Sequence, residues 1–279
     1  MDSIKPNERL KTVGRQMARL LAALYDRSQS TFTLADAEAI TGLDSKVASS
    51  LLHKAVRRGL VSRLERGVFV IVPPELGSNA EYAGNSYLTA VKLAGNAQCF
   101  ISHASAMEIQ RMVTQPQLVV FASSAKRIRS RKLQGTEFRF VLIKPDQYFG
   151  TMKHWVTKQE SIQISDLERT IVDGLRQPEY CGGVTEVAKG LWMRHGEMQT
   201  AKLVDYALRL GIGAVTRRLG YLLELYRIAP EEELTRLRRS LTATYLPLDP
   251  MLPKEGRHLR RWRLQLNILP EELEVVRTT

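Results

Sequence analysis

The segment DSKVASSLLHKAVRRGLVSRLERGVFVIVPP, residues 44–74, carries the strongest structural pattern in the chain. Asp44 is a residue type that caps helix N-termini, and the residues from Ser45 to Arg58 predict a helix. At about 100° per residue, one half of this helix is apolar and contains Val47, Ala48, Leu51, Leu52, Ala55 and Val56. The other half contains Lys46, Ser49, Ser50, His53, Lys54 and Arg57. Because no acidic residue follows Asp44 in the helix, this polar half suits phosphate groups and base edges in a DNA major groove.

The remainder of the segment predicts a β-hairpin. Val61 to Leu64 and Val68 to Val72 are rich in residues that favour strands, and Glu65-Arg66-Gly67 joins them. Two prolines at positions 73 and 74 end the second strand. Arg63 and Arg66 are expected on or near the hairpin, where they could contact a DNA backbone.

Upstream of this segment, two further helices are predicted. The first has an apolar stripe at three- and four-residue spacing, formed by Leu10, Val13, Met17, Leu20, Leu21 and Leu24. The second is short, runs from Leu34 to Ile40, and has Thr33 as its N-cap, Asp36 in its first turn and Gly42 at its end. The order of helix, short helix, turn, helix and hairpin predicts a winged helix-turn-helix DNA-binding domain over residues 1–75. Winged helices also mediate protein contacts, and a basic helix face can simply be solvated.

Composition agrees with a polyanion as the partner. The chain has 279 residues, which favours two domains, and 41 Lys and Arg against 29 Asp and Glu give a net charge of +12. Such a charge attracts nucleic acid first and an anionic membrane surface second. No apolar run approaches the roughly 18 residues of a membrane span, and residues 1–11 lack the apolar core of a secretion signal. With only Cys99 and Cys181, a disulfide framework is not expected, and a cytoplasmic protein is predicted.

The rest of the chain predicts a larger domain of mixed secondary structure. Residues 76–81 (LGSNAE) are predicted to be a linker, followed by a mixed α/β domain over residues 82–279, so that the fold class is α+β. Helices are expected over 82–94, 102–112 and much of 166–239. Strands are expected over 99–101, 118–121, 137–143, 154–157, 161–164 and 261–267. In the last of these, alternation places Trp262, Leu264 and Leu266 on one face, opposite Arg261 and Arg263.

Two basic segments occur in this larger domain. The denser one contains Lys126, Arg127, Arg129, Arg131 and Lys132. It predicts either a loop that contacts nucleic acid or an acidic partner, or a solvated loop. The second includes Lys254, Arg257, Arg260, Arg261 and Arg263.

SDLERTIVD, residues 165–173, is the most distinctive stretch of the larger domain. Ser165 and Glu168 fit a capping box. Asp166, Arg169 and Asp173 share one helix face, so one arginine could bridge two carboxylates. The alternative is a catalytic group of carboxylates formed by Asp166, Glu168 and Asp173.

The sequence contains few motifs that would indicate catalysis or the binding of a nucleotide or metal. There is no phosphate-binding G-x-x-x-x-G-K-[ST], no H-E-x-x-H and no G-x-S-x-G. The five histidines have no metal-ligand spacing, and His103 with Ser105 favours capping or packing over a nucleophile pair. Gly211-Ile212-Gly213 predicts a turn. Neither a metal nor a cofactor is expected, and the chain is not predicted to be an enzyme.

Several of these segments together resemble one known family. RGLVSRLERGVFVI (58–71), FISHASAM (100–107), SDLERTIVDGL (165–175), GGV (182–184), AVTRRLGYLLE (214–224), YLPLDP (245–250) and RWRLQLN (261–267) occur in an order that resembles the AbiEi antitoxins. These are the transcriptional-regulator components of AbiE type IV toxin–antitoxin systems, which are linked to abortive phage infection. The resemblance covers most of the chain.

The resemblance implies more than the residues alone indicate. The N-terminal domain would repress its own operon by binding inverted repeats in double-stranded promoter DNA, with the polar residues of the 45–58 helix as operator contacts. The C-terminal domain would counteract a nucleotidyltransferase-like toxin without a stable complex. Candidate antitoxic residues are Arg127, Arg129, Arg131, Lys132, Asp166, Glu168, Arg169 and Asp173. Two alternatives remain open: a ligand-sensing C-terminal domain, and a nuclease or protein-modifying enzyme.

Overall fold

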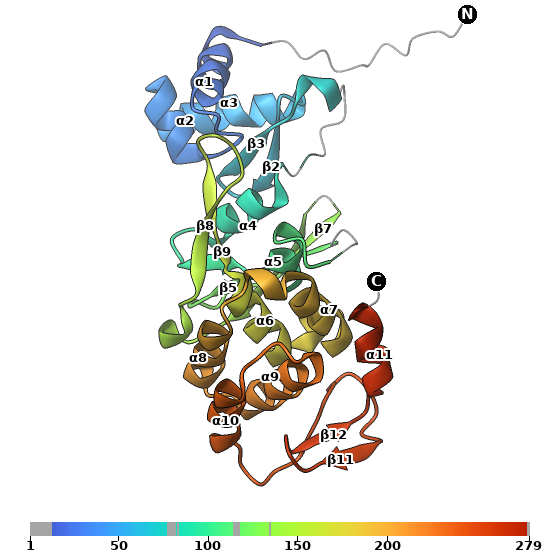
Figure 1. Ribbon diagram of the computed structural model, residues 1–279. Helices are drawn as coiled ribbons and strands as arrows, with labels where there is room; N and C mark the ends of the chain where they lie inside the picture. Colours follow the sequence, from blue (N-terminus) through green and yellow to red (C-terminus); the bar gives the residue numbers. More distant parts are fainter. Residues whose placement is uncertain (1–12, 77–81, 83, 114–117, 134, 278–279) are drawn as a thin grey trace, which may run out of the picture. The chain divides into compact units, whose positions relative to one another are not determined.

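The computed structural model describes residues 13–76, 82, 84–113, 118–133 and 135–277 (Figure 1). The chain forms two compact units. Unit 1 comprises Met1–Gln98, Arg129–Phe138 and Lys153–Ile162, and unit 2 comprises Cys99–Ile128, Arg139–Met152 and Gln163–Thr279. Both units contain helices and short strands, in agreement with the predicted α+β class.

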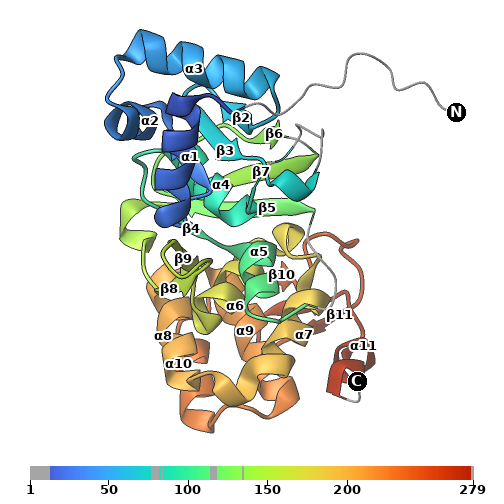
Figure 2. The same cartoon turned by 90° about the horizontal axis from the view of Figure 1, so that it is seen from above.

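Unit 1 begins with the helices α1 (Arg15–Asp26), α2 (Leu34–Thr41) and α3 (Ser45–Arg57). The predicted caps of α2 and α3 are confirmed. Thr33 and Asp36 form a reciprocal capping box, and Gly42 ends α2 at φ +72°. The Asp44 carboxylate accepts hydrogen bonds from the backbone N–H groups of residues 46 and 47, which fixes the start of α3. Figures 1 and 2 show these helices beside the β2–β3 hairpin.

Three short strands complete this part of unit 1: β1 (Thr31–Thr33), β2 (Val61–Glu65) and β3 (Val68–Ile71). They form an antiparallel sheet in the order β1-β3-β2. The hairpin was expected from the sequence, whereas β1 was not. The core between the helices and the sheet is formed mainly by Met17, Leu20, Leu24, Phe32, Ala37, Leu52, Ala55, Val61 and Phe69.

Two predicted core positions are wrong. Val13 precedes the first turn of α1, and Val47 lies in the first turn of α3; both side chains are 47% exposed. In α3 the buried stripe is Ala48, Leu52 and Ala55, and Val47 lies about 100° from Ala48, at its margin. Leu10 of the predicted stripe in the first helix is outside the described residues.

Unit 1 extends beyond the predicted domain of residues 1–75. It includes α4 (Ser86–Ala94), which is capped by the Asn85 side chain and packs near β1. It also includes β6 (Arg131–Leu133), where Leu133 packs on Leu64, Val68 and Val70. These apolar contacts join segments that are distant in sequence. They explain why the two units have other boundaries than the predicted domains of residues 1–75 and 82–279. Residues 77–81 of the predicted linker are outside the described residues.

The strands of the larger sheet are β4 (Cys99–Ile101), β5 (Val119–Ser124), β7 (Thr136–Leu142), β8 (Thr151–Trp155) and β9 (Ser161–Ser165), with β6 at one edge. Their order is β6-β7-β5-β4-β9-β8. β4 pairs antiparallel with β5 and parallel with β9. β8 begins three residues before the predicted 154–157 strand, and β6 was predicted to be part of a basic loop.

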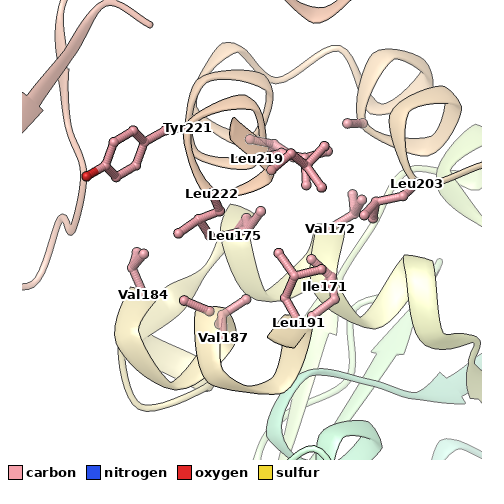
Figure 3. Close-up of a cluster of buried hydrophobic side chains, with 14 of the residues drawn as sticks. Ile171, Val172, Leu175, Val184, Val187, Leu191, Leu203, Leu219, Tyr221 and Leu222 are labelled. Carbon is pink, nitrogen blue, oxygen red and sulfur yellow. The ribbon is translucent and has the colours of Figure 1, made fainter. Parts of the chain in front are cut away.

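The helical core of unit 2 is built mainly from α6 (Leu167–Arg176), α7 (Val184–Arg194), α8 (Thr200–Leu210), α9 (Gly213–Tyr226) and α10 (Glu231–Arg239). Figure 3 shows Ile171, Val172 and Leu175 of α6 directed toward aliphatic residues of the neighbouring helices. The predicted turn is confirmed, because Gly211 ends α8 at φ +67°. α5 (His103–Ile109) packs against β5 and α6.

The C-terminal segment forms a small sheet of β10 (Leu246–Pro247), β11 (Arg257–Leu259) and β12 (Leu264–Leu266) in the order β10-β12-β11, followed by α11 (Pro270–Glu274). The predicted strand over 261–267 is shorter than expected, because residues 260–263 form a turn in which Arg263 has φ +50°. The predicted apolar face is confirmed: Trp262, Leu264 and Leu266 are buried. Trp262 lies against Gly220 of α9, where a Cβ atom would come within 2.0 Å of the indole.

Candidate nucleic-acid interface

A groove of about 890 Å³ lies between α3, the start of α2 and the β2–β3 hairpin of unit 1. Its polar lining is Ser45, Lys46, Ser49, His53, Arg63 and Arg66. Its apolar floor contains Leu34, Val56 and Phe69, which also belong to or pack on the core. No lining residue is acidic. The groove therefore offers three permanent cations and two hydroxyl groups to an anionic partner.

The structure divides the predicted contact residues of α3 into two groups. Lys46, Ser49 and His53 line the groove, while Ser50, Lys54 and Arg57 are exposed on α3 outside it. The helical wheel explains this division, because Ser49 and Ser50 differ by about 100°. The three floor residues were not predicted to be part of a site, because apolar side chains in a sequence indicate only a hydrophobic core.

The hairpin holds the two other predicted arginines beside the groove. Gly67 adopts φ +80° in the turn, a conformation that favours glycine. A β-bulge shifts the register of β2 against β3 between Arg63 and Glu65. Leu64 is buried and Arg63 is exposed, as expected for successive residues of a strand. The Arg63 Nε donates to the Glu65 carbonyl oxygen at 3.2 Å, which restrains the guanidinium next to the groove.

The basic segment of residues 126–132 is divided between the two compact units. Arg127 belongs to unit 2 and is exposed, whereas Arg129, Arg131 and Lys132 belong to unit 1. Arg131 forms an ion pair with Glu65 of β2, so its charge is already matched. Arg129 and Lys132 are exposed to solvent.

The carboxylates of residues 166–173 have cationic partners within unit 2. Lys202 of α8 lies 3.0 Å from the Asp166 carboxylate and 2.9 Å from that of Glu168. These two acids and their hydrogen bonds raise the pKa of Lys202 above its ordinary value, against the opposing effect of burial. Tyr206 also donates to Asp166. Lys202 and Tyr206 were not identified from the sequence, because they are more than thirty positions away.

The predicted capping box at this helix is wrong by one residue. Asp166, not Ser165, is the N-cap of α6, and its side chain accepts from the Arg169 backbone N–H. Ser165 instead makes a buried hydrogen bond with Thr170 at 2.7 Å. Of the two carboxylates that Arg169 was predicted to bridge, its side chain pairs with only Asp173, at 2.9 Å. Asp166 is contacted by the Arg169 backbone instead.

The described residues contain neither a metal-binding cluster nor a membrane-spanning helix. Among the described residues, no group of three or more His, Cys, Asp or Glu side chains is placed to hold a metal ion. Within the same part of the chain, no helix has both the length and the hydropathy needed to cross a membrane.

A family match covers the part of the chain that forms the groove. Residues 19–72 match the family described as "Transcriptional regulator, AbiEi antitoxin", which confirms the resemblance over this segment. The matched segment includes α2, α3 and the hairpin, and hence all eight predicted DNA-contacting residues.

A solved structure supports the fold of the whole chain. The crystal structure of the RV2827C protein from Mycobacterium tuberculosis superposes with a TM-score of 0.69 over 99% of both chains, at 16% sequence identity. At this identity the likeness concerns the fold alone. No curated protein matches the chain in sequence.

Proposed function

We propose that this chain, whose residues 19–72 match the AbiEi family, is a DNA-binding transcriptional repressor that also acts as an antitoxin. Its N-terminal segment would be a winged helix-turn-helix, with α3 as the recognition helix and the β2–β3 hairpin as the wing. It would bind inverted repeats in its own promoter. Its functional partner would be a nucleotidyltransferase-like toxin in the same cytoplasm.

The groove between α3 and the hairpin is the observation that carries this proposal. It joins a helix that presents Lys46, Ser49 and His53 to a hairpin that presents Arg63 and Arg66. Cations position a protein on phosphates, and short hydroxyl side chains can reach base edges. The absence of an acidic lining residue favours a polyanion over a basic peptide.

Specific promoter binding is the direct test. The full chain would be titrated in a gel shift against its own upstream promoter and a shuffled duplex of equal length, with nonspecific competitor. The proposal expects tight binding of the promoter only. Equal affinity for both duplexes would mean that the groove does not read sequence, and the repressor role would be dropped.

Salt dependence tests which cations contact phosphates. Lys46→Ala and Arg66→Ala should each weaken promoter binding. If each residue neutralises one phosphate, each variant should also lower the slope of log K against log salt by about 0.9. Lys158→Ala, which removes an exposed lysine of unit 1 outside the groove, is the control and should keep the wild-type slope. Unchanged slopes in both groove variants would remove these residues from the interface.

Adjacent serines offer a matched test of base reading. Ser49 lines the groove and Ser50 does not. Ser49→Ala should change the discrimination between operator variants by about 1 kcal/mol, the magnitude of one hydrogen bond. Ser50→Ala should leave the rank order as in wild type. If both variants rank all operators as wild type does, Ser49 is not a base contact.

For the antitoxic role, unit 2 is the proposed carrier. The family match supports an antitoxin in general, and co-expression with the toxin encoded next to it tests the specific role. The Lys46→Ala/Arg66→Ala double variant should still rescue growth, because its changes lie in unit 1. A failure of the wild-type chain to rescue growth would contradict the antitoxic role and leave a regulator without a toxin.

A catalytic role for Asp166, Glu168 and Asp173 has less support. Each carboxylate already has a cationic partner, Lys202 or Arg169. Glu168 and Asp173 are also buried, at 4% and 1% exposure. These contacts give the three carboxylates a structural role, as partners in buried or partly buried ion pairs.

A further inference from the structure

A second pocket of unit 1 is not used by the proposed DNA-binding surface. It encloses about 570 Å³, a volume within the range of sites for small organic molecules. Its walls come from the end of α1 and the turn after it, from the end of β3, and from the short 3-10 helix η1 (Pro74–Leu76). None of its described lining residues also lines the groove between α3 and the hairpin. The pocket is therefore a separate candidate site on the same unit.

Hydrogen bonds of the main chain hold the walls of this pocket. The Ser28 N–H donates to the Tyr25 carbonyl oxygen at 2.8 Å, which closes the turn after α1. The Ile71 N–H donates to the Ser30 carbonyl oxygen at 2.9 Å, which joins the segment after this turn to the end of β3. Because these are backbone contacts within the folded unit, the pocket is largely preformed.

Two tyrosines make the lining of the pocket aromatic. Tyr25 belongs to the last turn of α1, and its side chain is 54% exposed. Tyr82 packs on the apolar cluster of Leu64, Val68 and Val70, which holds it beside the hairpin. The ring face of a tyrosine carries partial negative charge, so an aromatic lining attracts cations and disfavours anions.

Glu75 of η1 gives the pocket its charge. It is the only charged residue among the described residues of the lining, and it is exposed. Ile71, Pro73 and Pro74 supply apolar surface to the same pocket. The chain carries a net charge of +12, and the charged residues that line the DNA groove are all basic. A pocket whose charge is negative therefore suits a ligand of the opposite sign to DNA.

We propose that this pocket binds a small aromatic amine in its protonated, ammonium form. The ammonium group pairs with the Glu75 carboxylate and lies against a tyrosine ring. The aromatic body covers Ile71 and the two prolines, whose apolar surface is thereby removed from water. A neutral analogue of the same shape loses the charge pairing, and an anionic analogue meets the carboxylate. Charge therefore sets the order of affinity among ligands of one shape.

Titration of the full chain with three probes of similar shape is the first test. At neutral pH phenethylamine is a cation, phenethyl alcohol is neutral and phenylacetate is an anion. With the isoleucine δ1 methyl groups labelled by ¹³C, Ile71 reports on the pocket, and the variant Ile71→Val assigns its signal. Ile40, a core residue of unit 1 outside the pocket, is the internal control.

The proposal expects a saturable shift of the Ile71 signal with phenethylamine, weaker binding of the alcohol, and no shift with phenylacetate. The Ile40 signal should stay in place throughout. No shift of Ile71 with the amine, or binding of the alcohol or phenylacetate that is as tight as that of the amine, would overturn the cation site.

A pair of glutamate variants provides the matched control. Glu75→Gln keeps the shape of the side chain but removes its charge. It should weaken phenethylamine binding by about two- to fivefold, as expected for an exposed ion pair, and leave the affinity for the alcohol unchanged. Glu38→Gln makes the same change in α2, outside the pocket, and should bind the amine as wild type does. Equal amine affinity in Glu75→Gln and wild type would contradict the role of the carboxylate.

Tyr25 allows the ring to be separated from its hydroxyl group. Tyr25→Leu removes the aromatic face and should weaken amine binding, whereas Tyr25→Phe keeps the ring and should retain most of the affinity. If Tyr25→Leu bound the amine as tightly as Tyr25→Phe, this ring would not contact the cation. None of these substitutions changes a residue that lines the DNA groove, so the test does not depend on the proposed function.

Discussion

Replacing Arg169 with methionine should lower the free energy of unfolding by about 3–5 kcal/mol, the cost of leaving a buried charge unpaired. Arg169 is fully buried and pairs with Asp173, which is 1% exposed. Its guanidinium also lies 4.4 Å from the centre of the Phe149 ring and donates to two carbonyl oxygens. Methionine keeps much of the side-chain volume but supplies neither charge nor donors. Urea unfolding followed by circular dichroism measures the loss.

A second substitution separates charge pairing from packing. The double variant Arg169→Met/Asp173→Leu has no orphaned carboxylate, so it should be more stable than the single variant. Arg239→Met, at an exposed position in the last turn of α10, should change stability by less than about 0.5 kcal/mol. If Arg169→Met were as stable as Arg239→Met, the buried pair would not hold unit 2 together.

Local sequence signals predicted the helix ends that border the groove of unit 1, because the contacts that fix those ends are local. Thr33, Gly42 and Asp44 fix the ends of α2 and α3 through contacts within three residues, and such contacts leave a pattern in the sequence. Adjacent segments of chain then form the groove. The helical wheel places Ser49 and Ser50 about 100° apart. It could not show which of the two lines the groove, because that depends on the position of the hairpin.

Unit 2 was predicted less well because long-range contacts determine it. Ser165-x-x-Glu168 satisfies the capping-box pattern, but Ser165 bonds to Thr170 and Glu168 pairs with Lys202. With these two side chains engaged, Asp166 becomes the cap of α6. In unit 1, β6 was missed for a similar reason, since Arg131 forms an ion pair with Glu65 and Leu133 packs on a hairpin more than sixty residues away. Neither partner is visible from the local sequence.

The stability of the chain should fall on mild acidification because of His103. Burial lowers the pKa of His103 from its ordinary 6.5 to about 4, although the charge of Asp173 opposes this shift. Arg176 and Arg169 add to the lowering, and hydrogen bonding to Gln177 opposes it. In the unfolded chain the same ring binds a proton near pH 6.5. Between about pH 6.5 and 4, the unfolded state therefore binds more protons than the folded state, and stability rises with pH.

The contribution of His103 is thus fully present above pH 6.5 and is lost as the pH falls toward 4. A shift of this size corresponds to about 3 kcal/mol over the window. The free energy of unfolding would be measured by urea titration between pH 4 and 8 for wild type and for His103→Phe, which keeps a planar ring but cannot be protonated. Other groups titrate equally in both proteins, so the difference between the two curves isolates His103. Parallel curves would show that His103 gains a proton as readily in the fold as in the unfolded chain, and its burial among Ser102, Tyr180 and Phe121 would then have no electrostatic consequence.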